Sequence, residues 1–252
     1  MEIIKNNVSF NVKGYYSEKW FSDKYFKNWE KSTFHIMDHY HNLNGIYIDI
    51  GAWIGPTVMY AAQKFRNVVA IEPDGAAFRR LTENLSVNNF NNITLVNKCL
   101  SDKDETISFG GNGKWGNSES TMLVSNPEYS SWEGRWSKEE REQHIKDVET
   151  ISIDTLFATY DINPEIISFI KMDIEGGEMI VIPGISHILS KYKPVLYLSL
   201  HYCFLQIHHI KDILDLLFDI YENCYLFNDE GTKYNINKET IMENRITSVV
   251  FE

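Results

Sequence analysis

Cysteine is scarce in this sequence, which has three cysteines in 252 residues. Cys99, Cys203 and Cys224 form no CxxC pair and show none of the spacings typical of zinc fingers. This pattern argues against a disulfide framework and against a structural zinc site. Three isolated thiols are typical of a protein that stays in a reducing compartment.

The sequence also lacks a long apolar run and a basic stripe. Its longest apolar stretch, Val195 to Leu200, is much shorter than the roughly 20 residues that span a bilayer. Residues 1–7 have neither the basic start nor the apolar run of a secretory signal. The formal net charge is -11, and basic residues occur in short pairs such as Arg79-Arg80, so phosphate backbones would be repelled. We expect a cytoplasmic protein with no membrane span and no nucleic-acid partner.

Apolar runs of strand length alternate with helix-length segments from residue 46 onward. Strands are expected at 46–50, 68–71, 93–96, 106–109, 149–153, 167–172, 195–200, 225–227 and 247–251. Helices are expected at 56–65, after Asp74, after Asp154, at 179–192 with an interruption at Pro183-Gly184, and at 207–221. This alternation predicts an α/β fold with a doubly wound, mostly parallel seven-stranded sheet of Rossmann-like type. The last two strands have no helix-length segment between them, which predicts an antiparallel edge strand.

The length suits a single domain over residues 1–252. We expect residues 1–44 to form an N-terminal cap of helices and a strand. Residues 110–146, called the insert below, show no sustained period and are predicted to form an acceptor-side wall. Its aromatic side chains would either contact a sugar ring or form a satellite cluster that fixes the loop; they are Trp115, Tyr129, Trp132 and Trp136.

The turn after the first strand reads Asp49-Ile50-Gly51-Ala52-Trp53-Ile54-Gly55. A dinucleotide fingerprint would need glycine where Trp53 and Pro56 stand, so hydride transfer from a nicotinamide cofactor is disfavoured. An aspartate before the turn would repel a pyrophosphate but suit a cationic ligand such as S-adenosylmethionine. The alternative is a tight turn in which Asp49 serves only as a capping group.

Two further segments fit a nucleoside site. Glu72 ends the second strand, 21 residues after Gly51, where a carboxylate can accept both ribose hydroxyls. Asn97-Lys98-Cys99 ends the third strand, where backbone groups would face the adenine edge. Packing is an equally good explanation for Cys99.

Five segments together resemble the FkbM family of methyltransferases. They are Asp49 to Gly55, Ile71 to Asp74, Asn97 to Asp102, Ser152 to Leu156 and Ile170 to Glu178. The resemblance runs from Trp29-Glu30 to His201 and implies a class I methyltransferase fold. It also implies S-adenosylmethionine as cofactor and, as acceptor, a hydroxyl of a sugar, a glycan, or a glycosylated or polyketide small molecule. The implied cofactor-binding residues are Glu30, Asp49, Gly51, Ala52, Trp53, Gly55, Glu72, Pro73, Asp74, Lys98, Cys99 and Asp173.

The sequence departs from the family pattern at two positions. Many members have Asn where this chain has Trp53, and many have Glu where it has Ser199. The acceptor side of the pocket is therefore expected to differ from that of the commonest relatives. Loss of acceptor-side residues is also what a non-catalytic cofactor-binding protein would show.

Acidic residues and one histidine are the candidates for the chemistry. Asp173 ends a buried strand, and His201 follows the next one, so both should lie at the rim of the ligand crevice. Asp173, Glu175 or His201 could act as the base toward an acceptor hydroxyl, and Asp173 and His201 could instead share Mg²⁺ or Mn²⁺. Glu178 is expected to stabilise the N-terminus of the following helix. Methylation of a small-molecule nitrogen remains an alternative, although the Pro-Pro-aromatic signature of nucleobase enzymes is absent after Asp173.

Overall fold

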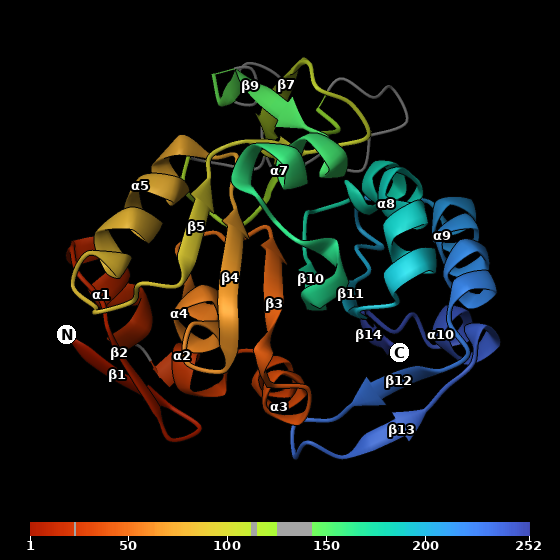
Figure 1. Ribbon diagram of the computed structural model, residues 1–252, viewed down its shortest axis with the longest axis horizontal. Helices are drawn as coiled ribbons and strands as arrows, with labels where there is room; N and C mark the ends of the chain where they lie inside the picture. The colour runs from red at the N-terminus through yellow and green to blue at the C-terminus, as the bar shows by residue number, and fades with distance from the viewer. Residues whose placement is uncertain (23, 112–114, 125–142) are drawn as a thin grey trace.

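The computed structural model describes residues 1–22, 24–111, 115–124 and 143–252. Its centre is an eight-stranded sheet with the order β13-β12-β14-β11-β10-β3-β4-β5 (Figure 1). Five neighbouring strands, β11, β10, β3, β4 and β5, run parallel. The strands are β3 Asn42–Ile50, β4 Phe65–Ile71, β5 Ile93–Val96, β10 Ile167–Met172, β11 Val195–Ser199, β12 Cys224–Phe227, β13 Lys233–Asn235 and β14 Ser248–Phe251.

All seven strands expected for the main sheet are present, and the last two, β12 and β14, pair antiparallel as expected. The expected count of seven is wrong, because β13 adds an eighth strand at the edge. Antiparallel β14 lies inside the sheet, between β11 and β12, and the outermost strand is β13. A short helix, α10 Lys238–Glu243, also lies between β12 and β14, where no helix was expected. β13 has only three residues, Lys-Tyr-Asn, and its mixture of polar side chains gives no strand period.

Helices cover both faces of the sheet and build a separate core on each. One core joins the α7, α8 and α9 face to strand residues such as Ile48 and Ile50. The other joins α3, α4, α5 and the N-terminal elements to alternate strand residues such as Tyr47 and Phe169. The helices are α1 Tyr15–Ser22, α2 Lys24–Asn28, α3 Lys31–His39, α4 Pro56–Ala61, α5 Gly75–Leu85, α7 Ile153–Tyr160, α8 Glu178–Tyr192 and α9 Ile207–Ile220, with the 3-10 turn Pro164–Ile166.

Helix α8 runs without interruption through Pro183, so the expected break is wrong. An interior proline costs roughly 3 kcal/mol, but the helix buries apolar side chains on both sides of it, including Ile182 and Ile185. Gly184 has a packing role as well. A Cβ there would lie 3.1 Å from Cα of Asp102, so glycine lets the two backbones approach.

Helix caps follow the sequence expectation in one case and not in another. Asp74 caps α5 as expected, with its side chain accepting from the backbone N–H groups of Ala76 and Ala77. Helix α7 is capped by Ser152 instead of Asp154, because the Ser152 hydroxyl accepts from Thr155 N–H at 3.3 Å. Asp154 pairs with His187 on the surface.

A second sheet lies beyond the carboxyl ends of β3, β4 and β5 (Figure 1). Its strands are β6 Cys99–Leu100, β7 Thr106–Gly111, β8 Ser120–Thr121 and β9 Ile145–Ile151, in the order β6-β9-β7-β8. The strand expected at 149–153 thus belongs to this insert sheet. Residues 1–11 form a hairpin of β1 Glu2–Lys5 and β2 Val8–Asn11. Within the described ranges, no helix has the length and hydropathy needed to cross a membrane.

Candidate active site

The glycine turn, residues 51–55, follows β3 and folds back over its neighbours. The N–H groups of Gly51 and Ala52 donate to the carbonyl of Ile71 at 3.0 Å each. Gly51 has a φ of +89°, and a Cβ there would lie 2.1 Å from the carbonyl oxygen of Asp173. Glycine is therefore required both for the backbone conformation and for the close approach of β3 to the end of β10.

Trp53 occupies the middle of the turn with a left-handed backbone, φ +48°. This conformation is uncommon for a bulky residue and costs free energy. Its ring contacts compensate: the indole packs edge-on against Trp20 at 4.8 Å between ring centroids. The indole Nε1 also donates to the carbonyl of Gly116 at 3.1 Å. Trp53 thus connects the N-terminal helices to the insert.

Glu72 closes the other side of the turn. Its carboxylate accepts from Trp53 N–H at 2.8 Å and from Asp74 N–H at 2.7 Å. Burial raises the pKa of Glu72 to about 8, although the two backbone hydrogen bonds oppose the shift. The second carboxylate oxygen of Asp74, Oδ2, accepts from Gly116 N–H at 2.6 Å, so the insert is fixed to this acidic segment.

A small cavity of about 50 Å³ lies between Glu72, Cys99 and the first part of the insert. Pro73 lines it too, and the insert contributes Asn117, Ser118, Ser120 and Met122. Burial raises the pKa of the Cys99 thiol to about 12, so it remains a neutral packing group. Lys98 lies outside this lining and forms an ion pair with Glu149 at 2.8 Å.

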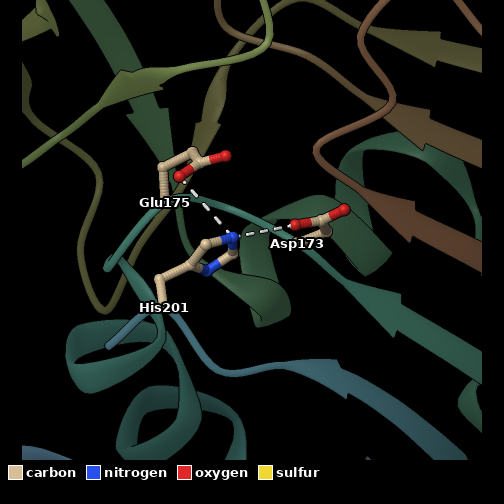
Figure 2. A group of neighbouring side chains, drawn as sticks. All are labelled: Asp173, Glu175 and His201. Carbon is tan, nitrogen blue, oxygen red and sulfur yellow. Dashed lines mark ion pairs between the residues drawn. The ribbon is translucent and has the colours of Figure 1, made fainter. Parts of the chain in front are cut away.

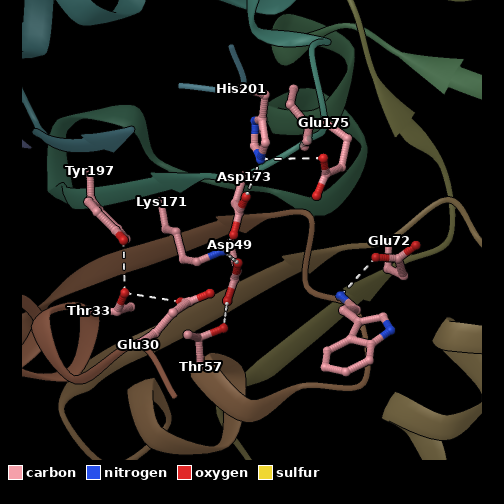
Figure 3. A network of polar contacts seen from close by, with 12 residues as sticks. Glu30, Thr33, Asp49, Thr57, Glu72, Lys171, Asp173, Glu175, Tyr197 and His201 are labelled. Carbon is pink, nitrogen blue, oxygen red and sulfur yellow. Dashed lines mark hydrogen bonds and ion pairs between the residues drawn. The ribbon is translucent and has the colours of Figure 1, made fainter. Parts of the chain in front are cut away.

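A buried ionic group lies below the turn (Figure 3). The Lys171 ammonium is 3.5 Å from Asp49 and 3.4 Å from Asp173. Asp49 is fully buried and accepts from the Thr57 hydroxyl at 2.6 Å. Burial opposes ionisation of Lys171, but Asp49 and Asp173 outweigh it and raise the pKa of the ammonium. Lys171 therefore lies between the two aspartates, although burial outweighs its effect at Asp49 and raises the pKa of that carboxyl.

Glu30 approaches the same group from the start of α3. Its carboxylate accepts from Thr33, whose hydroxyl lies 2.8 Å from the Tyr197 hydroxyl. Burial and the nearby charge of Asp173 raise the pKa of Glu30 to about 7. Glu30 is thus a carboxyl group that changes charge in the neutral pH range.

His201 is surrounded by carboxylates at the ends of β10 and β11. Its Nε2 lies 3.2 Å from Asp173 and 3.5 Å from Glu175, and Figure 2 shows the three side chains converging. Its Nδ1 lies 2.7 Å from Glu178, which is fully buried at the start of α8.

Burial disfavours the imidazolium, but Glu178, Asp173 and Glu175 outweigh it and raise the pKa of His201 well above its usual value. Burial raises the pKa of Glu175 to about 8. We call Asp173, Glu175 and His201 the histidine cluster.

A large cavity of about 590 Å³ opens onto the histidine cluster. It shares Gly51, Trp53 and Asp173 with the small cavity, so the two adjoin at the glycine turn. Its other lining residues include Trp20, Trp29, Glu30, Lys171, Tyr197, Ser199 and Ser248. An elongated ligand can therefore lie with one end beside Glu72 and the other beside His201.

The structure brings most of the sequence candidates to these two cavities. Five described candidates line neither cavity: Asp49, Gly55, Asp74, Lys98 and Trp115. Trp115 lines a separate cavity with Arg79, where Lys146 Nζ lies 4.6 Å from its ring. Tyr129, Trp132 and Trp136 lie outside the described residues. Three residues of the site were missed by sequence reasoning: Thr57, Lys171 and Tyr197. Glu178 lies in the first turn of α8 as expected, but its contact with His201 was not predicted. Lys171 could have been recognised from the sequence. It stands within the buried strand before Asp173, and a lysine is rarely buried without a partner of opposite charge.

Comparison with known proteins gives a family and a fold. The model of the methyltransferase FkbM domain matches residues 49–227. The solved structure of methyltransferase FkbM from Methylobacillus flagellatus KT is similar, with 18% identity, a TM-score of 0.53 and coverage of 88% of this chain and 48% of that chain. Precorrin-6y C5,15-methyltransferase from Geobacter metallireducens GS-15 matches with 11% identity and a TM-score of 0.43 over 87% and 83% of the two chains. No curated protein matches.

The fold and the acidic site at the carboxyl edge of its sheet define a methyltransferase-like α/β protein. Because the domain match covers more than half of the sequence, the chain belongs to the FkbM family of methyltransferases. It spans about half the length of the M. flagellatus FkbM structure that it matches.

Proposed function

We propose that this protein is an S-adenosylmethionine-dependent O-methyltransferase that acts on a hydroxyl of a sugar, a glycan or a glycosylated small molecule. One observation carries the proposal. Two adjoining cavities share the glycine turn and Asp173, and the larger one places His201 and two carboxylates where a methyl acceptor would enter.

The residues around the turn fit this cofactor. The buried Glu72 carboxylate is suited to the ribose hydroxyls, with Pro73 and Cys99 around the adenosine. Asp74 would support this part of the site from behind, by donating its N–H to Glu72 and accepting from Gly116. The ammonium of the methionine end is suited to Glu30, which lines the large cavity together with Ala52. Asp49 and Asp173 add negative charge beneath the turn, which favours a ligand that carries a sulfonium and an ammonium. When bound, the cofactor supplies an activated methyl group with sulfur as the leaving group.

In this proposal the acceptor occupies the large cavity. Its tryptophans, Trp20, Trp29 and Trp53, offer apolar ring surface beside polar groups such as Ser199, a combination that suits a sugar ring. The proposal further includes a single domain with the insert as part of the acceptor wall, and a cytoplasmic location. Positioning of the acceptor oxygen against the methyl group would supply much of the rate.

Two routes could remove the hydroxyl proton. In the first, Asp173 or Glu175 acts as a base, or His201 does so after it has lost the proton that its raised pKa favours; a base contributes about two to four powers of ten in rate. In the second, Asp173 and His201 hold Mg²⁺ or Mn²⁺, which lowers the pKa of the hydroxyl. Both routes use the side chains that converge in the large cavity.

Different features of the site argue against each of the two rival functions. N-methylation of a small molecule needs no base when the nitrogen is already neutral, and therefore gives no role to the histidine cluster. A non-catalytic cofactor-binding protein would need no carboxylates on the acceptor side. Ser199 stands where many relatives have Glu, but Glu175 and Glu178 still surround His201.

Methyl transfer from radiolabelled S-adenosylmethionine to a panel of nucleotide-sugars, oligosaccharides and small amines tests the proposal. We expect label in hydroxyl-bearing acceptors, and its loss in His201→Ala. Label found only in amines would overturn O-methylation, and cofactor binding without transfer to any acceptor would favour the non-catalytic protein.

A further inference from the structure

We propose that Asp173, Glu175 and His201 form a binding site for one first-row divalent cation, with Glu178 as the positioning residue for the imidazole. This inference deepens the proposed function, since the cation would lie on the acceptor side of the large cavity. It stands on the arrangement of four side chains and can be tested without cofactor or acceptor.

The three ligand atoms have the spacing of a coordination shell. His201 Nε2 lies 3.2 Å from Asp173 Oδ1 and 3.5 Å from Glu175 Oε2, and the three atoms all lie within 4.8 Å of one another (Figure 2). Ligand atoms about 2.1 Å from a metal are separated by roughly 3.0 Å at a right angle and roughly 3.4 Å at the tetrahedral angle. The distance to Asp173 falls within this range and the distance to Glu175 lies 0.1 Å above it, so little movement of these two pairs is needed to admit an ion.

The histidine is oriented as a metal ligand requires. Its Nδ1 lies 2.7 Å from Glu178 Oε1, so Nε2 is the nitrogen that faces Asp173 and Glu175. Metal-bound histidines generally donate their second N–H to a carboxylate or carbonyl, which fixes both the ring and its tautomer. Glu178 is itself fixed, because it is fully buried and accepts from Ile174 N–H at 3.2 Å.

The backbone of the segment between Asp173 and Glu178 is bent to bring these groups together. Glu175 has a φ of +52° and Gly176 a φ of +94°. A left-handed conformation at glutamate is strained, and such strain gathers at functional sites. Here the bend turns Glu175 back toward His201.

The site is open to an ion. The side chains of His201, Asp173 and Glu175 are 15%, 24% and 18% exposed, so all three can be reached from the large cavity. Asp173 keeps its other oxygen, Oδ2, on Lys171, which leaves Oδ1 for the ion. One imidazole and two carboxylates suit Mn²⁺ or a similar first-row ion better than Mg²⁺, which prefers oxygen alone. An acceptor hydroxyl that completed the shell would lose its proton to solvent water more readily.

The test uses Mn²⁺ on the full-length protein after chelator treatment, with cofactor and acceptor absent. Electron paramagnetic resonance and calorimetry should give one bound Mn²⁺ per chain, with a nitrogen coupling from one imidazole. His201→Ala should remove that coupling, and Glu175→Gln should weaken binding at least tenfold. Glu178→Gln should keep the coupling but weaken binding about tenfold to a hundredfold, as expected for loss of an outer-shell partner.

His187→Ala is the matched control, because His187 also pairs with an aspartate, Asp154, at 3.1 Å but lies on the surface. It should leave Mn²⁺ binding unchanged. Thermal unfolding of each variant checks that the fold is intact. The site is refuted if millimolar Mn²⁺ fails to bind stoichiometrically, or if binding occurs without nitrogen coupling or survives His201→Ala unchanged. Such a result would leave methyl transfer through a carboxylate base untouched, whereas Mn²⁺ binding without methylation of any acceptor would sink the proposed function alone.

Discussion

Gly116 in the insert is held directly by Trp53 in the glycine turn, through a hydrogen bond of 3.1 Å from the indole Nε1 to the glycine carbonyl. The same carbonyl accepts from Arg80 at 2.7 Å, and Gly116 N–H donates to Asp74 at 2.6 Å. The start of the insert is thus part of the wall of the small cavity as well as of the large one. We expect it to influence cofactor affinity in addition to acceptor binding.

Replacing Trp53 with Phe tests this connection, because phenylalanine keeps a ring for Trp20 but has no donor for Gly116. One net hydrogen bond is worth about 1 kcal/mol, so affinity for the demethylated cofactor should fall about fivefold. Hydrogen exchange at residues 115–122 should become faster while the main sheet stays protected. Unchanged exchange in this segment would contradict the role given to Trp53.

The sequence predicted the parallel half of the main sheet well, and its antiparallel edge less well. Long apolar runs such as 167–172 are buried on both faces and have a clear signal, whereas β13 is short and polar. Pro183 misled the local reasoning because burial of the surrounding apolar side chains outweighs its cost. A local sequence pattern does not show which tertiary contacts will bury those side chains.

For the site, the order of the strands along the sequence predicted which residues lie at the rim of the ligand crevice. It did not predict which side chains those residues contact. Asp173 and His201 end neighbouring parallel strands, so their closeness follows from topology alone. The contact of Glu178 with His201 does not, because it depends on the left-handed bend at Glu175 and Gly176. Gly116 reaches the turn through side-chain contacts with Trp53 and Arg80, which no spacing rule describes.

Lys171 should be essential for stability. Its replacement by Met leaves Asp49 buried with no cation beside it, and breaking a buried ion pair from one side costs about 3 kcal/mol. The double variant Lys171→Met/Asp49→Asn should recover much of that loss, because the uncompensated charge is gone. Urea unfolding of the wild type, both single variants and the double variant measures the coupling. Additive effects would contradict a direct pairing of the two side chains.

Glu30 should make cofactor affinity depend on pH. Burial and Asp173 raise its pKa to about 7, so the carboxyl is mostly protonated at pH 6 and mostly ionised at pH 8. Because the ammonium of the cofactor favours the ionised form, binding below the pKa must expel a proton, and affinity should be about tenfold weaker at pH 6 than at pH 8. Calorimetry in two buffers of different ionisation enthalpy should also show proton release. Glu30→Gln should bind with a smaller pH dependence than the wild type, with the remainder centred near the pKa of Glu72, about 8; a slope equal to that of the wild type would assign the effect to another group.

His201 and Asp173 should act on turnover far more than on cofactor affinity. Single-turnover methylation should fall by about two to four powers of ten in His201→Ala and in Asp173→Asn, with cofactor affinity within a few-fold of the wild type. If the cation proposal holds, a chelator should silence the wild type and Mn²⁺ should restore it. Near-normal turnover in both variants would leave positioning of the acceptor to explain catalysis.

The most direct measurement for the account as a whole is a calorimetric titration of the protein with S-adenosylhomocysteine, for the wild type and Glu72→Ala. We expect one site per chain, no competition from nicotinamide dinucleotides, and affinity lowered about tenfold to a hundredfold in the variant, the range expected when a hydrogen bond to a charged group is lost. Because Glu72 also accepts from the N–H groups of Trp53 and Asp74, thermal unfolding of the variant should be measured alongside. Absence of binding to the wild type, or displacement of the ligand by NAD, would contradict the methyltransferase site described above.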